Sequence, residues 1–391
     1  MTIAQGISKK VALKKETVWG VAATAAGARY IRRVSSDLSL SKDSYESKEI
    51  RTDQQTAVHR HGMRKVEGTL KGELSPGSYS DLIAAQLRKN FAAGPSLTGN
   101  DISATAGGFE TVAGDFVVAG FRPGIVLRAA GFANAQINAR NFVITKVTAK
   151  ALAGEYLTET PALVEAAGGM VTLAAAGLTS YVPESGHTDD SFTIEHFFGD
   201  IGESEVFTGI KVDSIDIKLP PTGMAEISAK LMGKDLVTGQ VEHFTNPAPA
   251  STMDTVSAVN GRIYVTGSRL TLLTSLDLSI KAGLSTEPVV GSNTAPELFR
   301  GRVVGTGNST AFFENGQLRD AFLHETEVPV FAVFPVSDAP DADFLAFRLP
   351  RVKFSGASKD DGEKGVIQNL PFVILKATGD TTISIQDSAA V

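Results

Sequence analysis

The chain has 391 residues, of which 42% are hydrophobic and 20% charged, and it contains no cysteine. This composition is typical of a globular protein with one large domain or several smaller ones. The lack of cysteine excludes disulfide scaffolds, thiolate metal sites and cysteine nucleophiles. The 43 acidic residues exceed the 37 basic ones, giving a formal charge of −6. This charge argues against a protein that grips nucleic acid by neutralising its phosphates.

The sequence has no continuous apolar segment near its beginning and no run of 18 apolar residues anywhere. We therefore expect neither an export signal nor insertion into a membrane. We expect the protein to be made and kept in the cytosol.

Polar and apolar residues alternate in three stretches, which predicts strands with one wetted and one buried face. The first spans 65–74, and the second, 214–232, predicts a hairpin that turns at 220–223. The third lies around 276–281. The polar positions of these stretches are Lys65, Glu67, Thr69, Lys71, Glu73, Asp216, Lys218, Glu226, Lys230, Asp277 and Lys281.

Helix signals are scarce, so the sequence predicts a mainly β fold with short α-helices. The best candidate begins near Ser78 or Ser80, either of which is a suitable N-cap, and continues to Leu87. A weaker candidate covers 316–323. Each follows a strand that has a polar face.

Short segments recur along the chain in one order, which indicates an internal repeat. The residues 37–40 match 277–280, 66–69 match 303–306, and 80–83 match 319–322. A fourth match, 218–221 with 348–351, has a shorter spacing, which requires an insertion in the first copy. The sequence therefore predicts two tandem units.

Composition suggests where the units begin and end. Residues 1–33 form an N-terminal arm, and the first unit is discontinuous, at 34–96 and 184–240. Between them, 97–183 is rich in Ala, Gly, Val and Thr and predicts a small all-β domain with strands near 116–118, 125–127 and 142–144. A Pro-containing linker at 241–258 leads to the second unit at 259–391. Two long polar loops, 44–61 and 282–300, follow the first strand of each unit.

One cluster of residues could carry catalysis. His187, Asp189, Asp190, Glu195 and His196 supply imidazoles and carboxylates of the kind found in hydrolytic metal sites. Their spacing fits no metal signature, and His196 alternates with apolar residues as in a strand, so a buried structural histidine is favoured. The segment 359–365 is interpreted as a charged hairpin tip rather than a calcium loop. We therefore predict no catalytic, cofactor or metal site and no enzyme activity.

Several longer segments resemble a known family. They are 11–20 (VALKKETVWG), 185–195 (SGHTDDSFTIE), 219–224 (LPPTGM), 357–365 (ASKDDGEKG) and 381–388 (TTISIQDS). Together they resemble the tail tube proteins of long-tailed, non-contractile bacteriophages. The resemblance implies rings of subunits stacked into a hollow tube in the virion, with a shared β-barrel as the inner wall and viral DNA passing through. It also implies tape-measure, tail terminator and tip proteins as partners, and an outward-facing decoration domain at 97–183.

This resemblance gives the polar residues of the alternating stretches an expected role in lining the lumen. Two repeats per chain further predict a ring of three chains, a pseudo-hexamer. The long loops are expected to contact the neighbouring ring, together with the N-terminal arm, through Glu46, Arg51, Asp53, Glu287, Asn293 and Glu297. The alternatives are a β-rich host-binding surface protein and a metal-dependent hydrolase built around 187–196.

Overall fold

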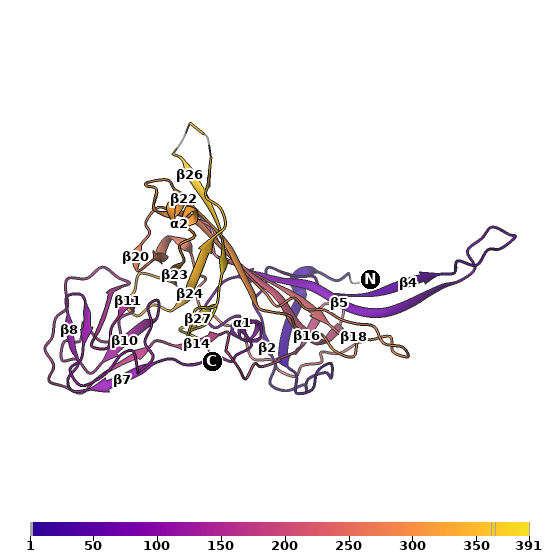
Figure 1. Ribbon diagram of the computed structural model, residues 1–391. Coiled ribbons are helices and arrows are strands. Elements are labelled where there is room, and N and C mark those ends of the chain that lie inside the picture. Colours follow the sequence, from indigo (N-terminus) through magenta and orange to yellow (C-terminus); the bar gives the residue numbers. More distant parts are fainter. Residues whose placement is uncertain (1–2, 361, 364, 391) are drawn as a thin grey trace.

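The computed structural model describes residues 3–360, 362–363 and 365–390. It confirms the mainly β fold, with 46% of residues in strands and 5% in helices. Two α-helices occur in these ranges, α1 (Ser80–Leu87) and α2 (Gln317–Leu323), together with short 3₁₀ turns at Gly6–Ser8 and Ala258–Asn260. Figure 1 shows a body of sheets from which one long hairpin extends far to one side.

Most strands belong to one extended antiparallel sheet system. Its strands are β1 (Lys9–Lys15), β2 (Arg29–Tyr30), β3 (Ser35–Ser36), β4 (Ser39–Glu46), β5 (His59–Glu73), β6 (Ala92–Ala93), β14 (Leu178–Tyr181), β15 (Phe192–Phe198), β16 (Glu203–Leu219), β17 (Glu226–Gly233), β18 (Asp235–Gly239), β19 (Arg262–Val265), β20 (Ser268–Arg269), β21 (Leu273–Lys281), β22 (Val304–Phe312), β23 (Val328–Pro335), β24 (Phe344–Phe354), β25 (Ser358–Lys359), β26 (Ile367–Ile374) and β27 (Ser384–Asp387).

Eight strand positions of this system form a continuous sheet, which we call the main sheet. Their order is β4, β5, β17, β16, β21, β22, β26 and finally β24 with β25. The short strand β3 extends the first position, because it also pairs with β5. Every neighbour is antiparallel, as the alternating pattern of the sequence favours.

The two halves of the main sheet repeat the same topology. Along the chain, the first half consists of a hairpin (β4, β5), a helix (α1) and two further strands (β16, β17). Its strand order in the sheet is β4, β5, β17, β16. The second half consists of β21, β22, α2, β24 and β26, and its strand order in the sheet is β21, β22, β26, β24. The strands of the two halves are thus paired in the same order.

The strand register also tests the sequence matches. Leu40 lies opposite Val66, but Ile280 lies opposite Gly305 and not Val303, so the matches of 37–40 with 277–280 and of 66–69 with 303–306 cannot both be right. Equating Leu40 with Ile280 equates Val66 with Gly305. The fourth match is wrong. Lys211 pairs with Met232 on β17 and Lys353 pairs with Val373 on β26, so Lys211 corresponds to Lys353, and Lys218 does not correspond to Arg348. Polar and apolar residues alternate along both strands, so a match shifted by an even number of residues still aligns polar with polar positions.

The apolar face of the main sheet is covered by the two helices and by a second layer of strands. Leu82, Ile83 and Leu87 of α1 are buried against it, and Gln86 Nε2 donates to Ile280 O (2.9 Å). The second layer arises because the long strands β16 and β24 each pair in two places: β16 with β15 and β18 in its first part and with β17 and β21 in its second. The expected serine cap of α1 is absent, since Ser78 Oγ bonds Ser75 Oγ instead.

A seven-stranded antiparallel sheet forms a separate layer with its own apolar core. Its strands are β7 (Ser96–Gly99), β8 (Ser103–Thr105), β9 (Gly108–Glu110), β10 (Val126–Ala130), β11 (Phe142–Val147), β12 (Ala151–Tyr156) and β13 (Val171–Ala175). The stretch 116–118, expected to be a strand, is a turn in which Phe116 is buried. The strand β14, within the span 97–183, pairs with β27 and β6 of the large sheet system.

This layer is held firmly against β19, β23 and β24. Val126 and Val143 share an apolar cluster with Phe331 and Phe344. Polar contacts surround the cluster: Arg262 Nη1 pairs with Glu155 Oε1 (2.9 Å), and Gln386 Nε2 donates to the carbonyls of Val126 and Ala176 (2.7 Å each). The inserted layer therefore packs on the second half of the chain, although it lies within the first half in sequence.

The segments expected to form an N-terminal arm (1–33) and a linker (241–258) are largely part of the folded body. β1 pairs along its whole length with β15, and Val11, Ala12 and Leu13 are buried. In the stretch 241–258, the amide of Ala248 bonds Ala28 O and that of Val256 bonds Leu74 O (2.8 Å each). The stretch 44–61 is a hairpin arm: β4 and β5 pair out to Glu46 and His59, and residues 47–58 form the loop that joins them (Figure 1).

Candidate functional site

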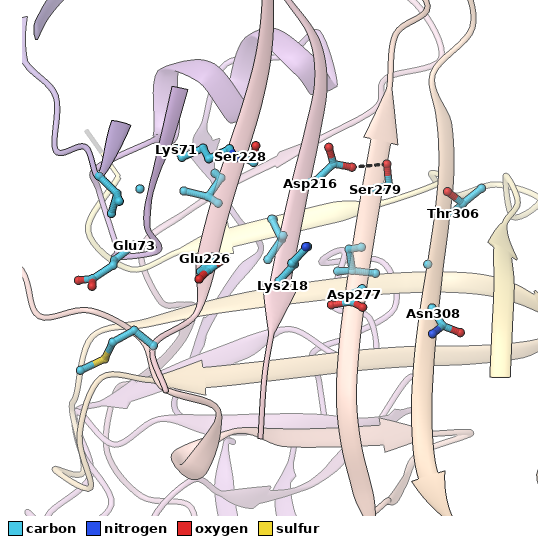
Figure 2. Close-up of a pocket in the computed structure, with 17 residues that line it drawn as sticks. Lys71, Glu73, Asp216, Lys218, Glu226, Ser228, Asp277, Ser279, Thr306 and Asn308 are labelled. Atoms are coloured by element: carbon cyan, nitrogen blue, oxygen red, sulfur yellow. Dashed lines mark hydrogen bonds between the residues drawn. The ribbon is translucent and has the colours of Figure 1, made fainter. Parts of the chain in front are cut away.

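The polar residues of the alternating stretches lie together on one face of the main sheet, which we call the polar face. Cross-strand pairing aligns Glu73 with Glu226, Glu226 with Lys218, and Lys218 with Asp277. Two residues along, it aligns Lys71, Ser228, Asp216 and Ser279 in a second row. Figure 2 shows these side chains pointing from adjacent strands to the same side.

The polar face is shallow, hollowed and electrically balanced. A depression of about 800 Å³ runs across β5, β17, β16, β21 and β22. The eleven polar residues identified from the sequence include five lysines and five carboxylates. Two of them have partners outside this set: Lys230 Nζ lies 3.2 Å from Asp213 Oδ2, and Asp216 accepts a hydrogen bond from Ser279 Oγ. Partial burial raises the pKa of Asp277, while the nearby Lys218 cation opposes that rise.

The opposite side chains of the same strands explain why this face is turned outward. Leu70, Ile217, Ile227 and Leu278 alternate with the polar residues and are each 3% exposed or less. Since successive side chains of a strand point to opposite faces, burying the apolar set against α1 forces the polar set to the other side. The sheet orientation is therefore fixed by its core.

Sequence patterns missed several members of the polar face. Ser214, Ser228, Ser279, Thr306 and Asn308 lie on it as well. The alternation of polar and apolar residues is weak around Thr306 and Asn308, because Gly305 and Gly307 take the place of apolar residues on the buried face of β22. A side chain at Gly307 would lie 2.3 Å from the ring of Phe372, which fills that space instead.

The residues expected to contact a neighbouring ring divide into two groups. Glu46, Arg51 and Asp53 lie on the exposed hairpin arm, where Arg51 and Asp53 form an ion pair of 3.0 Å. Glu287 is exposed on the connection between β21 and β22. The other two are engaged within the chain: Asn293 O accepts the amide of Arg64 (2.7 Å), and Glu297 Oε1 accepts Lys211 Nζ (2.7 Å).

The residues of the possible metal site are dispersed among structural contacts. His196 is buried with its Nε2 2.8 Å from Ser36 Oγ, while His187 is exposed. Asp189 binds Lys211 and Arg300, and Glu195 accepts the amides of His243 and Phe244. Within residues 3–360, 362–363 and 365–390, no three His, Asp or Glu residues gather as they would around a metal ion.

Both ends of the main sheet are open edges. In the described chain, β4 pairs with β5 alone and β25 with β26 alone. The amide of Asp360 donates to Ile367 O on β26 (3.0 Å), so the adjacent amide of Lys359 points away from that strand. An exposed edge of this kind can pair with a strand of another chain.

The fold and the polar face define a mainly β structural protein whose large sheet has an open strand edge at each end in the described residues. A family model described as phage tail tube protein matches residues 6–374, nearly the whole chain. The chain therefore belongs to the phage tail tube protein family and is a structural component of a phage tail. A comparison with curated proteins gave no match. None of the described helices is long and apolar enough to cross a membrane.

Proposed function

We propose that this protein is the tail tube subunit that assembles into stacked rings of three chains, through which viral DNA passes. The main sheet carries this proposal, because it contributes a polar face, an apolar back and two open edges in one chain. Such a subunit needs no catalytic site. We expect it to assemble in the host cytoplasm and to contact tape-measure, terminator and tip proteins in the virion.

The internal repeat suggests how one chain joins the next. Within the chain, the last strand of the first half (β16) pairs with the first strand of the second half (β21), with Leu219 opposite Leu276 and Ser214 opposite Lys281. The strand corresponding to β16 in the second half is β24 with β25, and the strand corresponding to β21 in the first half is β4. Repeating the same contact between chains would pair β25 of one chain with β4 of the next.

Strand number then gives the size of the ring. Three chains with eight strand positions each would supply 24 strands. At roughly 4.8 Å per strand and a tilt of some 40°, the backbone diameter is about 37 to 48 Å. After side chains are allowed for, such a ring admits a DNA duplex of roughly 20 Å. A ring of three chains with a single unit each would have half as many strands and would be too narrow for a DNA duplex.

The charge of the polar face suits transport of a polyanion. Its five lysines are matched by five carboxylates, so a ring lined by this face would neither hold the phosphates tightly nor repel them strongly. The inserted layer, which packs on β19, β23 and β24, would project at three positions per ring. True threefold symmetry with approximate sixfold symmetry of the wall is expected.

Electron microscopy of the purified full-length protein tests the proposal. We expect hollow tubes whose reconstruction shows three chains and three projections per ring. Six chains per ring would contradict the trimer and mean that the two halves are not two wall units. A protein that stays monomeric at high concentration would instead favour the host-binding alternative.

A further inference from the structure

The two halves of the chain contain equivalent connections with different conformations. The segment between Leu40 and Val66 and the segment between Ile280 and Gly305 occupy the same place in the repeat and differ in length by one residue. The first is the arm (44–61), a two-stranded hairpin that extends away from the body (Figure 1). The second, which we call the connection (282–303), is folded back onto the first half.

Buried ion pairs hold the connection in place. Lys211 is 1% exposed, and its Nζ contacts Glu297 Oε1 of the connection (2.7 Å) and Asp189 Oδ2 (2.8 Å). Arg300 Nε binds Asp189 Oδ1 (2.6 Å) and its Nη2 donates to Asp190 O (3.0 Å). Leu284 N donates to Asp213 Oδ1 (2.9 Å). Releasing this segment would remove Glu297 Oε1 and Leu298 O from a buried lysine and leave Asp189 as its one remaining ion-pair partner among these contacts, which is unfavourable.

The fixed connection also supports the base of the arm. The amide of Arg64 on β5 donates to Asn293 O, and Arg64 forms a parallel bridge with Thr294. Arg64 Nη2 binds Asp235 Oδ1 (2.8 Å) beside it. The strand β5 is thus paired with β4 on one side and touched by the connection on the other at the point where the arm leaves the body.

Beyond this point the arm has no support from its own chain. All residues from 48 to 61 are exposed, and Ile50 is 100% exposed. Residues 47–58 contain no strand and are joined to the body only through β4 and β5. A hairpin that projects alone in this way is marginally stable in water. Its tip carries both charge signs, with Lys48 and Arg51 near Glu49 and Asp53, as suits a contact between identical chains.

We infer that the arms alone bind the adjoining ring, whereas the connections serve as internal supports, so each ring contacts the next through three hairpins and not six. The partner of the arm is a second copy of this chain in that ring. This inference rests on the proposed function. It replaces the expectation that the arm and the connection play the same role, and it makes successive rings fit at intervals of 120° instead of 60°.

Matched cysteine variants test this division, because the chain has no cysteine of its own. Ile50→Cys lies on the arm and Val290→Cys on the connection, and both native side chains are fully exposed in the single chain. Maleimide labelling of tubes, relative to unassembled protein, is expected to slow about tenfold or more at position 50 and to stay nearly unchanged at position 290, because thiol reaction requires access. Protection at position 290 equal to that at 50 would overturn the inference.

A shortened arm gives a second test. Glu46 and His59 lie opposite each other, so replacing 47–58 with Asn-Gly closes the hairpin with a tight turn. This variant is expected to form single rings that do not stack, while replacing the exposed residues 287–290 with Gly-Ser-Gly-Ser leaves tubes of normal length. Tubes formed by the shortened-arm variant would refute the inference about the arms but not the proposal that the chains form rings. Failure of the wild-type chain to form rings would refute both.

Discussion

His196 lies between two layers of the fold, where burial disfavours the protonated form of its side chain. Its ring is 5.0 Å from that of Phe207, and Nε2 lies within hydrogen-bond distance of Ser36 Oγ. Burial, helped by the Lys9 and Arg33 cations, lowers the pKa of His196 from 6.5 to about 3. Although Glu205 Oε2 is 3.8 Å from Nδ1, the imidazole is neutral near neutral pH, so this contact is not an ion pair there.

This environment predicts a pH-dependent stability. The unfolded chain takes up a proton at His196 below pH 6.5 and the folded chain does not, so stability is lost as pH falls from 6.5 toward 3. Between pH 7.5 and 5 the loss attributable to this residue is about 2 kcal/mol. Urea unfolding of unassembled wild type and His196→Gln at both pH values measures it. Between the two pH values, His196→Gln should lose less free energy of unfolding than wild type, by about the amount attributed to His196. His59→Gln, at an exposed histidine, should lose as much as wild type. Equal losses in all three would contradict the assignment.

At the scale of single elements, β5 has the clearest two-sided character. Glu67 and Thr69 lie on the polar face, and Leu70 is 3% exposed on the other. In assembled tubes we expect a small maleimide to label Glu67→Cys and Thr69→Cys through the open lumen, and to leave Leu70→Cys unlabelled. Labelling at 70 with protection at 67 and 69 would reverse the proposed direction of the sheet.

The open edge at β25 gives a second prediction at this scale. The amide of Lys359 points away from β26, so Lys359→Pro removes a donor that the pairing of β25 with β26 does not use. Proline also obstructs pairing on that edge. We expect a folded chain that sediments as a monomer under conditions where wild type and Lys359→Ala form rings. Normal rings from the proline variant would show that β25 does not join chains.

The sequence predicted elements wherever side chains alone determine the structure. Alternation at 65–74 identified both faces of β5, because each residue there either packs on α1 or faces outward. A loop was expected at 44–61, and the structure has one at 47–58. The flanking ends of β4 and β5 were missed, since they have no buried face and so no apolar period. The role of Glu297 could not be predicted, because its partner Lys211 lies 86 positions away and the pairing depends on the folded main sheet.

At the scale of the whole molecule, the two halves of the chain share a strand order but are unequal. The first half bears the arm, and the second bears the surface on which the inserted layer packs. The connection is folded inward and supports the base of the arm at Arg64. Segments at equivalent places in the two halves therefore have different conformations within one chain.

The position of β27 has a consequence for folding. This strand pairs with both β14 and β24, which lie far from it or from each other in sequence, and Asp387 accepts the amide of Gly77 just before α1 (2.9 Å). Contacts between residues so distant in sequence form late in folding. The pairing that joins β14 to β24 through β27 is therefore expected to form among the last steps, after the local hairpins of both halves.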